Sequence, residues 1–179
     1  SYYGNVNPIG PRSCYDEGKR VAEMFIYEFQ KKYNMNSKII RIFNTYGPNM
    51  NHDDGRVVSN FINQALANED ITIYGDGTQT RSFCYVDDLV SGIVSYLALD
   101  ENYLGPINLG NPVELNMLDL AEKITRLTSS KSKIIFSSLP KNDPMKRKPD
   151  ISLAKEKFNF SPKIAIDLGL IKTVDYFKN

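Results

Sequence analysis

A tyrosine and a lysine, Tyr15 and Lys19, stand four residues apart near the start of this chain. On a helix this spacing places the two side chains on one face, one turn apart. An ammonium group beside a phenol stabilises the phenolate, which can take a proton from a sugar hydroxyl while a hydride leaves the same carbon. Such a reaction needs a nicotinamide cofactor to accept the hydride. The pattern by itself is more typical of an amphipathic helix with a solvated lysine, so the neighbouring residues must decide.

The elements that would position this pair alternate between helices and strands. Apolar residues at helical spacing predict helices at 14–33, 57–67, 86–97, 116–127, 151–158 and 166–177. Apolar and β-branched runs predict a buried strand at 38–43 and further strands at 71–74, 81–85, 106–109 and 134–136. Gly, Asn and Pro predict loops at 1–13, 44–54 and 141–149. This order predicts an α/β fold with parallel pairing of strands.

The composition is that of an ordinary soluble protein, with 41% hydrophobic and 24% charged residues, and 179 residues suffice for one domain with its own core. A net charge of +1 gives no reason to expect a nucleic acid or a membrane as partner. The sequence shows neither a signal peptide nor an apolar run long enough to cross a membrane. We therefore expect a cytoplasmic segment.

The sequence offers little to a metal ion. Cys14 and Cys84 lack metal-ligand or redox spacing, and we expect both to be free, buried thiols in a reducing compartment. The single histidine, His52, cannot build a histidine metal site, and beside Asp53 and Asp54 it is expected to be solvated. No metal site is predicted.

The residues around Tyr15 resemble the active-site segment of a known enzyme family. Residues 5–20 read NVNPIGPRSCYDEGKR, and further matches follow in order at 41–48, 54–61, 74–83, 108–112 and 143–150. Over essentially the whole chain these motifs are similar to those of UDP-glucuronate decarboxylases, also called UDP-xylose synthases, which are extended short-chain dehydrogenase/reductases. The resemblance implies NAD as cofactor, a UDP-sugar as substrate, and a fold made of the end of a Rossmann-like parallel sheet plus a small α/β substrate-binding region.

A glycine-rich loop that opens a helix, G-x-G-x-x-G or G-x-x-G-x-x-G, is absent from the sequence. Such a loop holds the pyrophosphate of a dinucleotide. In the resembled family it precedes the tyrosine, together with a Thr or Ser and a Glu that complete the active site. We therefore expect residues 1–179 to be a single C-terminal segment that lacks the NAD-binding half. For the full-length enzyme the resemblance implies a homodimer with the Tyr15 helix in its interface, and it leaves a membrane-anchored Golgi form open.

The resemblance assigns catalytic roles to three residues. Tyr15 is implied to be the base that removes the C4 hydroxyl proton of UDP-glucuronate, and Lys19 is implied to support it and to bind the nicotinamide ribose. Arg81 is the third candidate, because a fixed guanidinium suits either the diphosphate or the sugar carboxylate; its structural alternative is an ion pair with Asp87. Arg147, inside D-P-x-x-R-x-P-D, is implied to grip the uridine diphosphate, whereas a charged loop of this kind is ordinarily just solvated.

Asn44 and Thr45 follow a predicted strand, at the end where α/β sheets bind their ligands. The resemblance assigns Asn44 to the sugar nucleotide and Thr45 to NAD; the alternative is that they only shape a turn. Arg56 resembles a cofactor-side arginine of the family.

Three further residues are candidates for substrate binding. Ser59 and Asn60 open the helix predicted at 57–67, where backbone N–H groups favour a phosphate, although Ser59 has nearly equal claim to be a plain helix residue. Tyr74 is implied to line the uracil pocket, while aromatic strand residues are more often core. The family commonly has arginine where this chain has Asn49, which removes one positive charge near the bound nucleotide.

Two other functions stay open. Related 4-epimerases and 4,6-dehydratases begin with the same C4 oxidation, so Tyr15, Lys19 and Arg81 do not distinguish them from a decarboxylase; the segments 5–20 and 51–60 favour the decarboxylase. As an isolated segment, the chain is alternatively a non-catalytic module that binds UDP weakly and does not hold NAD tightly.

Overall fold

The structure is a computed structural model that describes residues 7–99, 103–139 and 146–179. The helices are α1 (Ser13–Tyr33), α2 (Val57–Ala67), α3 (Val86–Leu97), α4 (Met117–Thr128), α5 (Ser152–Phe158) and α6 (Ile166–Phe177). The strands are β1 (Ile40–Ile42), β2 (Thr45–Tyr46), β3 (Ile71–Tyr74), β4 (Thr80–Ser82), β5 (Cys84–Tyr85), β6 (Ile107–Leu109), β7 (Glu114–Asn116), β8 (Ile134–Ser137) and β9 (Lys146–Arg147).

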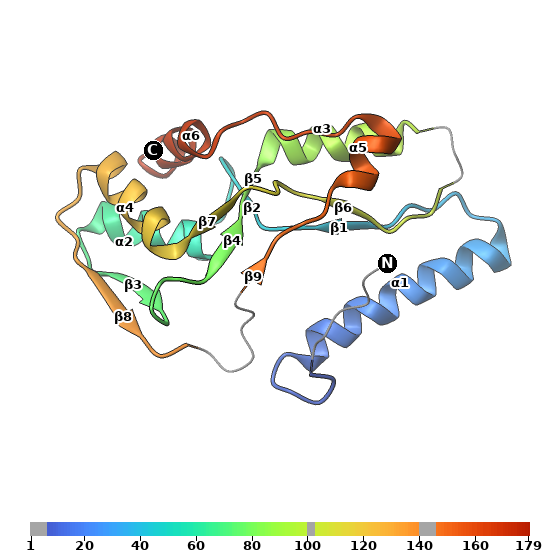
Figure 1. Ribbon diagram of the computed structural model, residues 1–179, viewed down its shortest axis with the longest axis horizontal. Helices are drawn as coiled ribbons and strands as arrows, with labels where there is room; N and C mark the ends of the chain where they lie inside the picture. Colours follow the sequence, from blue (N-terminus) through green and yellow to red (C-terminus); the bar gives the residue numbers. More distant parts are fainter. Residues whose placement is uncertain (1–6, 100–102, 140–145) are drawn as a thin grey trace.

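Most strands pair in parallel, which confirms the expected α/β class. β1 pairs with β6, β2 with β5 and β3 with β8, all in parallel. The remaining sheet has the order β7-β4-β9, in which β4 is antiparallel to β7 and parallel to β9. Figure 1 shows β1 and β6 side by side under α3 and α5, while α2, α4 and α6 gather at the other end of the molecule.

Two clusters of buried apolar side chains hold these elements together. The larger lies among α2, α4, α6 and β3, where Ile62, Leu120 and Leu170 are fully buried. The smaller lies between β6, α3 and α5 and includes Tyr96 and Leu109. Burial of each large aliphatic side chain stabilises the fold by about 1.5–3 kcal/mol.

The helix ends follow local rules. The Asn116 side chain accepts a hydrogen bond from the Asp119 backbone N–H at 2.7 Å, which caps α4 as the sequence predicts. Asn34, Asn68 and Asn159 end α1, α2 and α5 in the left-handed conformation that asparagine tolerates better than most residues. These caps fix the lengths of the helices and hence the loops that reach the site.

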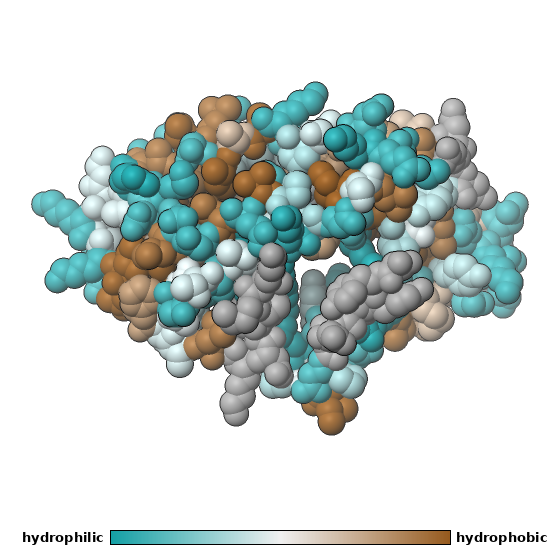
Figure 2. Space-filling model, viewed as in Figure 1, coloured by the Kyte–Doolittle hydropathy of each residue, from teal (hydrophilic) through white to brown (hydrophobic). Residues whose placement is uncertain are grey.

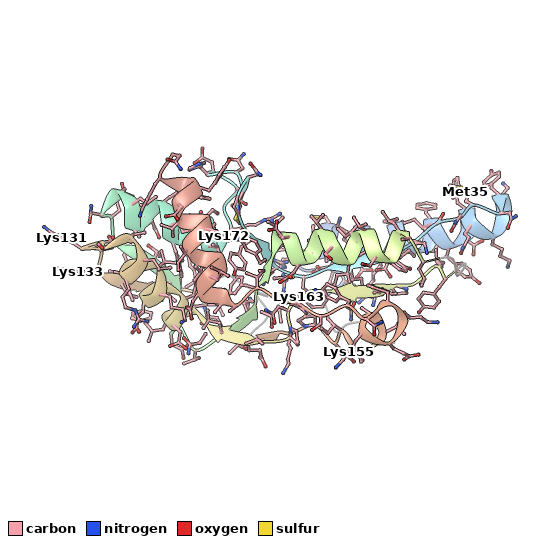
Figure 3. All side chains as sticks on the ribbon, turned by 90° about the horizontal axis from the view of Figure 1, so that it is seen from above. Met35, Lys131, Lys133, Lys155, Lys163 and Lys172 are labelled. Atoms are coloured by element: carbon pink, nitrogen blue, oxygen red, sulfur yellow. The ribbon has the colours of Figure 1, made fainter. Side chains whose placement is uncertain are left out.

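Helix α1 lies apart from the rest of the chain (Figure 1) and buries none of its residues. Arg41 of β1 links this strand to α1. Its Nε and Nη2 each donate a hydrogen bond to the Glu23 carboxylate at 2.7 Å. Met35, just beyond α1, lies at the opposite end of the molecule from Lys131 and Lys133 (Figure 3). The molecule is therefore elongated, and Glu23 in the middle of α1 ties this helix to β1.

The structure corrects two expectations about burial. The strand predicted at 38–43 forms, but Ile42 is 56% exposed, because β1 pairs only with β6 and α1 does not cover it. Cys14 is exposed on α1, whereas Cys84 is buried as expected. Ile135 and Phe136, successive residues of β8, are exposed as well.

Three short strands were not predicted. β2 lies inside the expected loop 44–54, and β9 lies inside the expected loop 141–149, of which residues 141–145 fall outside the described part, as do residues 1–6 of the first loop. β7 precedes α4. Strands of two or three residues carry no periodic signal, and their existence depends on a partner strand far away in the sequence.

Candidate active site

A cavity of about 980 Å³ opens between α1 and the body of the molecule. Its walls come from the start of α1, the loops after β1 and before α2, the helix α2, and the strands β3, β4 and β9. Figure 2 shows this face hollowed near its centre, with hydrophilic side chains on the visible rim. Elements from both ends of the chain thus meet around one hollow.

Arginines dominate the charge of this cavity. Arg12, Arg56, Arg81 and Arg147 all line it, and no Asp or Glu lines it within the described ranges. The whole chain is nearly neutral, with 22 Lys and Arg against 21 Asp and Glu. A hollow whose charged lining residues, among those described, are all arginines attracts an anion of several charges.

Two of these arginines lie on neighbouring strands in register. Arg81 of β4 pairs with Arg147 of β9 in the parallel ladder, so both side chains leave the sheet on the same face. Arg81 is only 9% exposed, and its Nη1 donates to the Thr80 carbonyl at 2.9 Å. Like charges at paired positions destabilise a sheet, so this arrangement favours an anion held between the two guanidinium groups.

The Tyr15 and Lys19 side chains lie together at the start of α1, as their spacing predicts. The Lys19 ammonium sits 5.6 Å from the centre of the Tyr15 ring. Tyr15 lines the cavity and is 60% exposed, whereas Lys19 is not among the lining residues. Tyr15 therefore lies at the cavity wall, with the Lys19 ammonium over its ring.

The loop before α2 is tied by Asp54. Its Oδ1 accepts hydrogen bonds from the Arg56 backbone N–H at 2.9 Å and from the Ser59 hydroxyl, and its Oδ2 lies 3.6 Å from Arg56 Nε. Ser59 is fully buried, donates also to the Arg56 carbonyl at 2.9 Å, and does not line the cavity. Arg56 and Asn60 do line it. The structure thus brings Arg56 and Asn60 to the site and gives the Ser59 hydroxyl partners in the loop.

Asn44 and Thr45 lie where β1 ends, and both line the cavity. The Asn44 carbonyl accepts the Cys84 backbone N–H at 2.9 Å, and the Thr45 hydroxyl donates to the Phe43 carbonyl at 2.9 Å. These two hydrogen bonds fix the path of the chain after β1, and they leave Asn44 and Thr45 in the wall of the cavity.

Tyr74 ends β3 at the cavity with half of its surface exposed, so it is not a core residue. Its carbonyl accepts a hydrogen bond from the Gln79 amide. Gln79, which is buried at the wall, was missed by the sequence analysis, as was Arg12. Arg12 precedes Tyr15 by three residues, a helical spacing that could have identified it.

The groups beneath the cavity stay neutral. Burial raises the pKa of the Cys84 thiol to about 12 and that of Tyr46 still further, with the nearby Asp88 carboxylate adding to both shifts. Asp88 itself accepts the Lys163 and Ile164 backbone N–H groups at 3.0 and 2.9 Å. Cys84 is therefore a structural thiol and not a nucleophile.

Within the described ranges, no helix is long and apolar enough to cross a membrane. Over the same ranges, no group of three or more His, Cys, Asp or Glu is placed to hold a metal ion. The His52 ring packs at a tilt against Phe177, with ring centres 4.3 Å apart, which gives this exposed side chain an aromatic partner that the sequence did not suggest.

NAD fits this chain only in part. The family resemblance assigns Lys19, which lies beside the Tyr15 ring, to a nicotinamide ribose. A glycine-rich loop opening a helix, which would hold the pyrophosphate, is not found in the parts of the chain that the structure describes. The described residues therefore do not include the loop that would hold the pyrophosphate of NAD.

The comparisons define the class first. The chain belongs to the NAD dependent epimerase/dehydratase family, whose sequence model matches residues 3–110. The structure is similar to UDP-glucuronic acid 4-epimerase from Bacillus cereus in complex with UDP-glucuronic acid and NAD, with a TM-score of 0.86, 29% identity, and coverage of 98% of this chain and 57% of that one. UDP-glucose 4-epimerase from Thermotoga maritima is similar at a TM-score of 0.88 and 29% identity, over 98% of this chain and 60% of that chain.

Within this class the chain is a homologue of UDP-glucuronic acid decarboxylases. It is 51% identical over 179 residues to UDP-glucuronic acid decarboxylase 1 of Arabidopsis thaliana. This match covers 100% of this chain and 41% of that protein. It is 53% identical over 170 residues to decarboxylase 3 of the same plant, over 95% of this chain and 49% of that protein. The chain thus spans less than half the length of these relatives.

Proposed function

We propose that this chain supplies the Tyr/Lys pair and the UDP-sugar site of an NAD-dependent decarboxylase that converts UDP-glucuronate to UDP-xylose. One observation carries the proposal: Tyr15 lines the same cavity as four arginines, without a carboxylate among the described lining residues. The identities of 51% and 53% to UDP-glucuronic acid decarboxylases support the choice of substrate.

In this proposal, Arg81 and Arg147 hold the diphosphate. Their paired positions direct two guanidinium groups to the same side of the sheet. Guanidinium groups bind phosphate oxygens through two parallel hydrogen bonds, which fixes the orientation of the sugar as well as its affinity. Tyr74 and Asn60 line the same cavity and are proposed to contact the rest of the nucleotide, with Asn44 on the sugar.

Tyr15 acts as the general base on the C4 hydroxyl, and Lys19 stabilises its phenolate. When bound, NAD would supply the oxidation and the later re-reduction at C4, with Thr45 and Arg56 proposed to hold it on their side of the site. The resulting C4 ketone stands β to the C5 carboxylate, so the bond to that carboxylate breaks and carbon dioxide leaves while its electrons pass into an enolate at C4. C5 then takes up a proton, and Tyr15 returns its proton to the C4 oxygen as the ketone is reduced.

A second candidate function is a nucleotide-sugar 4-epimerase, which the similarity to two solved 4-epimerases supports. The same Tyr15 chemistry begins both reactions, and so does that of a 4,6-dehydratase. As an isolated segment, the chain is alternatively a nucleotide-binding module without turnover, because it spans 41% to 49% of its relatives.

Calorimetric titration of the chain with UDP and, separately, with NAD tests the proposal. We expect UDP to bind and NAD not to bind tightly. Arg147→Gln should weaken UDP binding about tenfold or more, because it removes a charge-assisted contact. Lys148→Gln is the matched control, since Lys148 is its exposed neighbour, pairs with Glu114 at 3.2 Å and does not line the cavity.

Failure of UDP to bind the unmodified chain would overturn the proposed substrate site. Equal loss of affinity in the two variants would mean that general charge, and not the Arg81–Arg147 pair, attracts the nucleotide. Tight binding of NAD would contradict our expectation that the chain needs a glycine-rich loop to hold this cofactor.

A further inference from the structure

We propose that Gln64 and Gln79 are positioning residues that hold one edge of β3 in place for the nucleobase of the substrate. The proposal rests on the proposed function, because it concerns the nucleotide end of the same substrate. Gln64 belongs to α2, which precedes β3 in the chain, and Gln79 comes just before β4, which follows it. Both glutamines line the cavity.

Strand β3 is paired along one edge. Its partner β8 lies toward the outside of the molecule (Figure 1). The backbone N–H groups of Ile71 and Gly75 donate to carbonyls within residues 133–137, each at 2.8 Å. Because backbone groups alternate in direction along a strand, those of Thr72 and Tyr74 point to the other edge. No strand in the described part of the chain pairs with that edge, and both residues line the cavity.

The two carboxamides occupy the two ends of this edge. Gln64 Oε1 accepts the Thr72 backbone N–H at 3.3 Å, and Gln79 Nε2 donates to the Tyr74 carbonyl. The Thr72 carbonyl and the Tyr74 N–H lie between them, and neither is hydrogen-bonded to another of the described residues. The glutamines therefore leave one backbone acceptor and one backbone donor at the cavity wall. A nucleobase, whose ring carries a donor beside an acceptor, is the part of the substrate that can pair with them.

Gln79 also ties this edge to the arginine pair. Only 6% of Gln79 is exposed, and its carboxamide packs on Gly75, where a Cβ would lie 3.5 Å from Gln79 Oε1 and 3.6 Å from Nε2. Arg81, which the proposed function assigns to the diphosphate, follows two residues later on β4. The bond from Gln79 to Tyr74 thus fixes the edge of β3 relative to the start of β4. A ligand that joins a base to a diphosphate gains affinity when both of its sites are held at a fixed separation.

This role predicts a selective loss of affinity. Without either carboxamide, the edge of β3 must be ordered when the base binds, and that ordering costs affinity. The two arginines are left in place, so the affinity for a diphosphate alone should not change. A glutamine that only stabilised the fold would instead weaken every ligand of the cavity alike.

Titration of the chain with UDP, uridine and inorganic pyrophosphate tests the inference. Gln64→Met and Gln79→Met keep the size of the side chain and remove its hydrogen bonds. We expect each to weaken UDP and uridine about 3- to 10-fold and to leave pyrophosphate unchanged. Thr78→Val is the matched control, because the Thr78 hydroxyl donates to Asp76 at 2.7 Å beside Gln79, yet Thr78 is exposed and does not line the cavity.

The outcomes separate this inference from the proposed function. If UDP binds and both glutamine variants bind it as tightly as the unmodified chain, the inference is wrong and the proposed site stands. If the variants weaken UDP and pyrophosphate equally, or if Thr78→Val has the same effect, the glutamines only support the fold and the inference is overturned. If UDP does not bind the unmodified chain, both are overturned. Circular dichroism checks the folding of each variant, and the two glutamines lie on different elements, so either variant alone can decide.

Discussion

The residues of the site differ in what holds them. Arg81 is almost fully buried and is fixed by its strand, whereas Tyr15 stands exposed on a helix that the core does not touch. Ser59 is the residue on which the structure and the family resemblance point in different directions. Its hydroxyl is buried against Asp54 and the Arg56 carbonyl, so we assign it to the geometry of the loop that presents Arg56.

Ser59→Ala tests this assignment. The change leaves Asp54 without one of its buried donors, and we expect the free energy of unfolding to fall by about 1–3 kcal/mol. Urea denaturation followed by fluorescence or circular dichroism measures it. Ser152→Ala is the control, because Ser152 makes a comparable bond to Asp150 at an exposed site. A variant of unchanged stability that loses UDP affinity would instead support the direct phosphate role of Ser59.

At the scale of elements, the helices fall into two kinds. α6 packs tightly, with the Tyr46 hydroxyl donating to the Ile166 carbonyl at 3.3 Å, and the Thr173 hydroxyl donating to the Gly169 carbonyl at 2.7 Å. α1 has no buried residue and presents apolar side chains such as Phe25 to solvent. The family resemblance predicts a dimer through α1. The exposed apolar side chains of this helix favour that prediction.

A pair of glycine substitutions tests this contrast. A Cβ at Gly169 would overlap the Tyr46 hydroxyl and lie 2.9 Å from Tyr85 Cδ2, so Gly169→Ala should lower the free energy of unfolding by about 1–3 kcal/mol. Nothing lies within 4 Å of a Cβ at Gly18 on α1, so Gly18→Ala should be neutral or stabilise by up to about 1 kcal/mol through helix propensity. Thermal melting of both variants measures the difference. Equal destabilisation would show that α1 is packed as tightly as α6.

At the scale of the whole molecule, folding sorts charge that the composition balances. The net charge is +1, yet the described lining of the cavity holds arginines and no carboxylate. The gathering of arginines around the cavity is thus a product of the tertiary structure. Salt screens the attraction between these arginines and an anionic ligand, and so weakens it.

Ionic strength tests the electrostatic origin of binding. Raising sodium chloride from about 0.05 M to about 0.5 M should weaken UDP binding several-fold, because screening shortens the reach of the arginine charges. Binding of uridine, which lacks the diphosphate, should change little. Parallel calorimetric titrations of the two ligands measure this, and an equal response of UDP and uridine would contradict an arginine-built diphosphate site.

The amino-acid sequence by itself determined the elements and part of the site. The apolar periodicity places α2, α3 and α6 at their observed bounds, Asn116 marks the start of α4, and the Tyr15–Lys19 spacing puts an ammonium beside a phenol. These features depend on neighbours within one or two helical turns, which the sequence displays directly. The family resemblance added Arg56, Arg81 and Arg147, residues that periodicity does not mark.

Only the tertiary structure decided which of these residues meet. The register of β4 against β9 pairs Arg81 with Arg147, the burial of Ser59 takes its hydroxyl out of the cavity, and the approach of α1 brings Arg12 to the same hollow. The first and the last of these features join segments far apart in the chain, whereas Ser59 is held by the neighbouring Asp54 and Arg56. The geometry of the two long-range features follows from packing of the whole core, which no local pattern encodes.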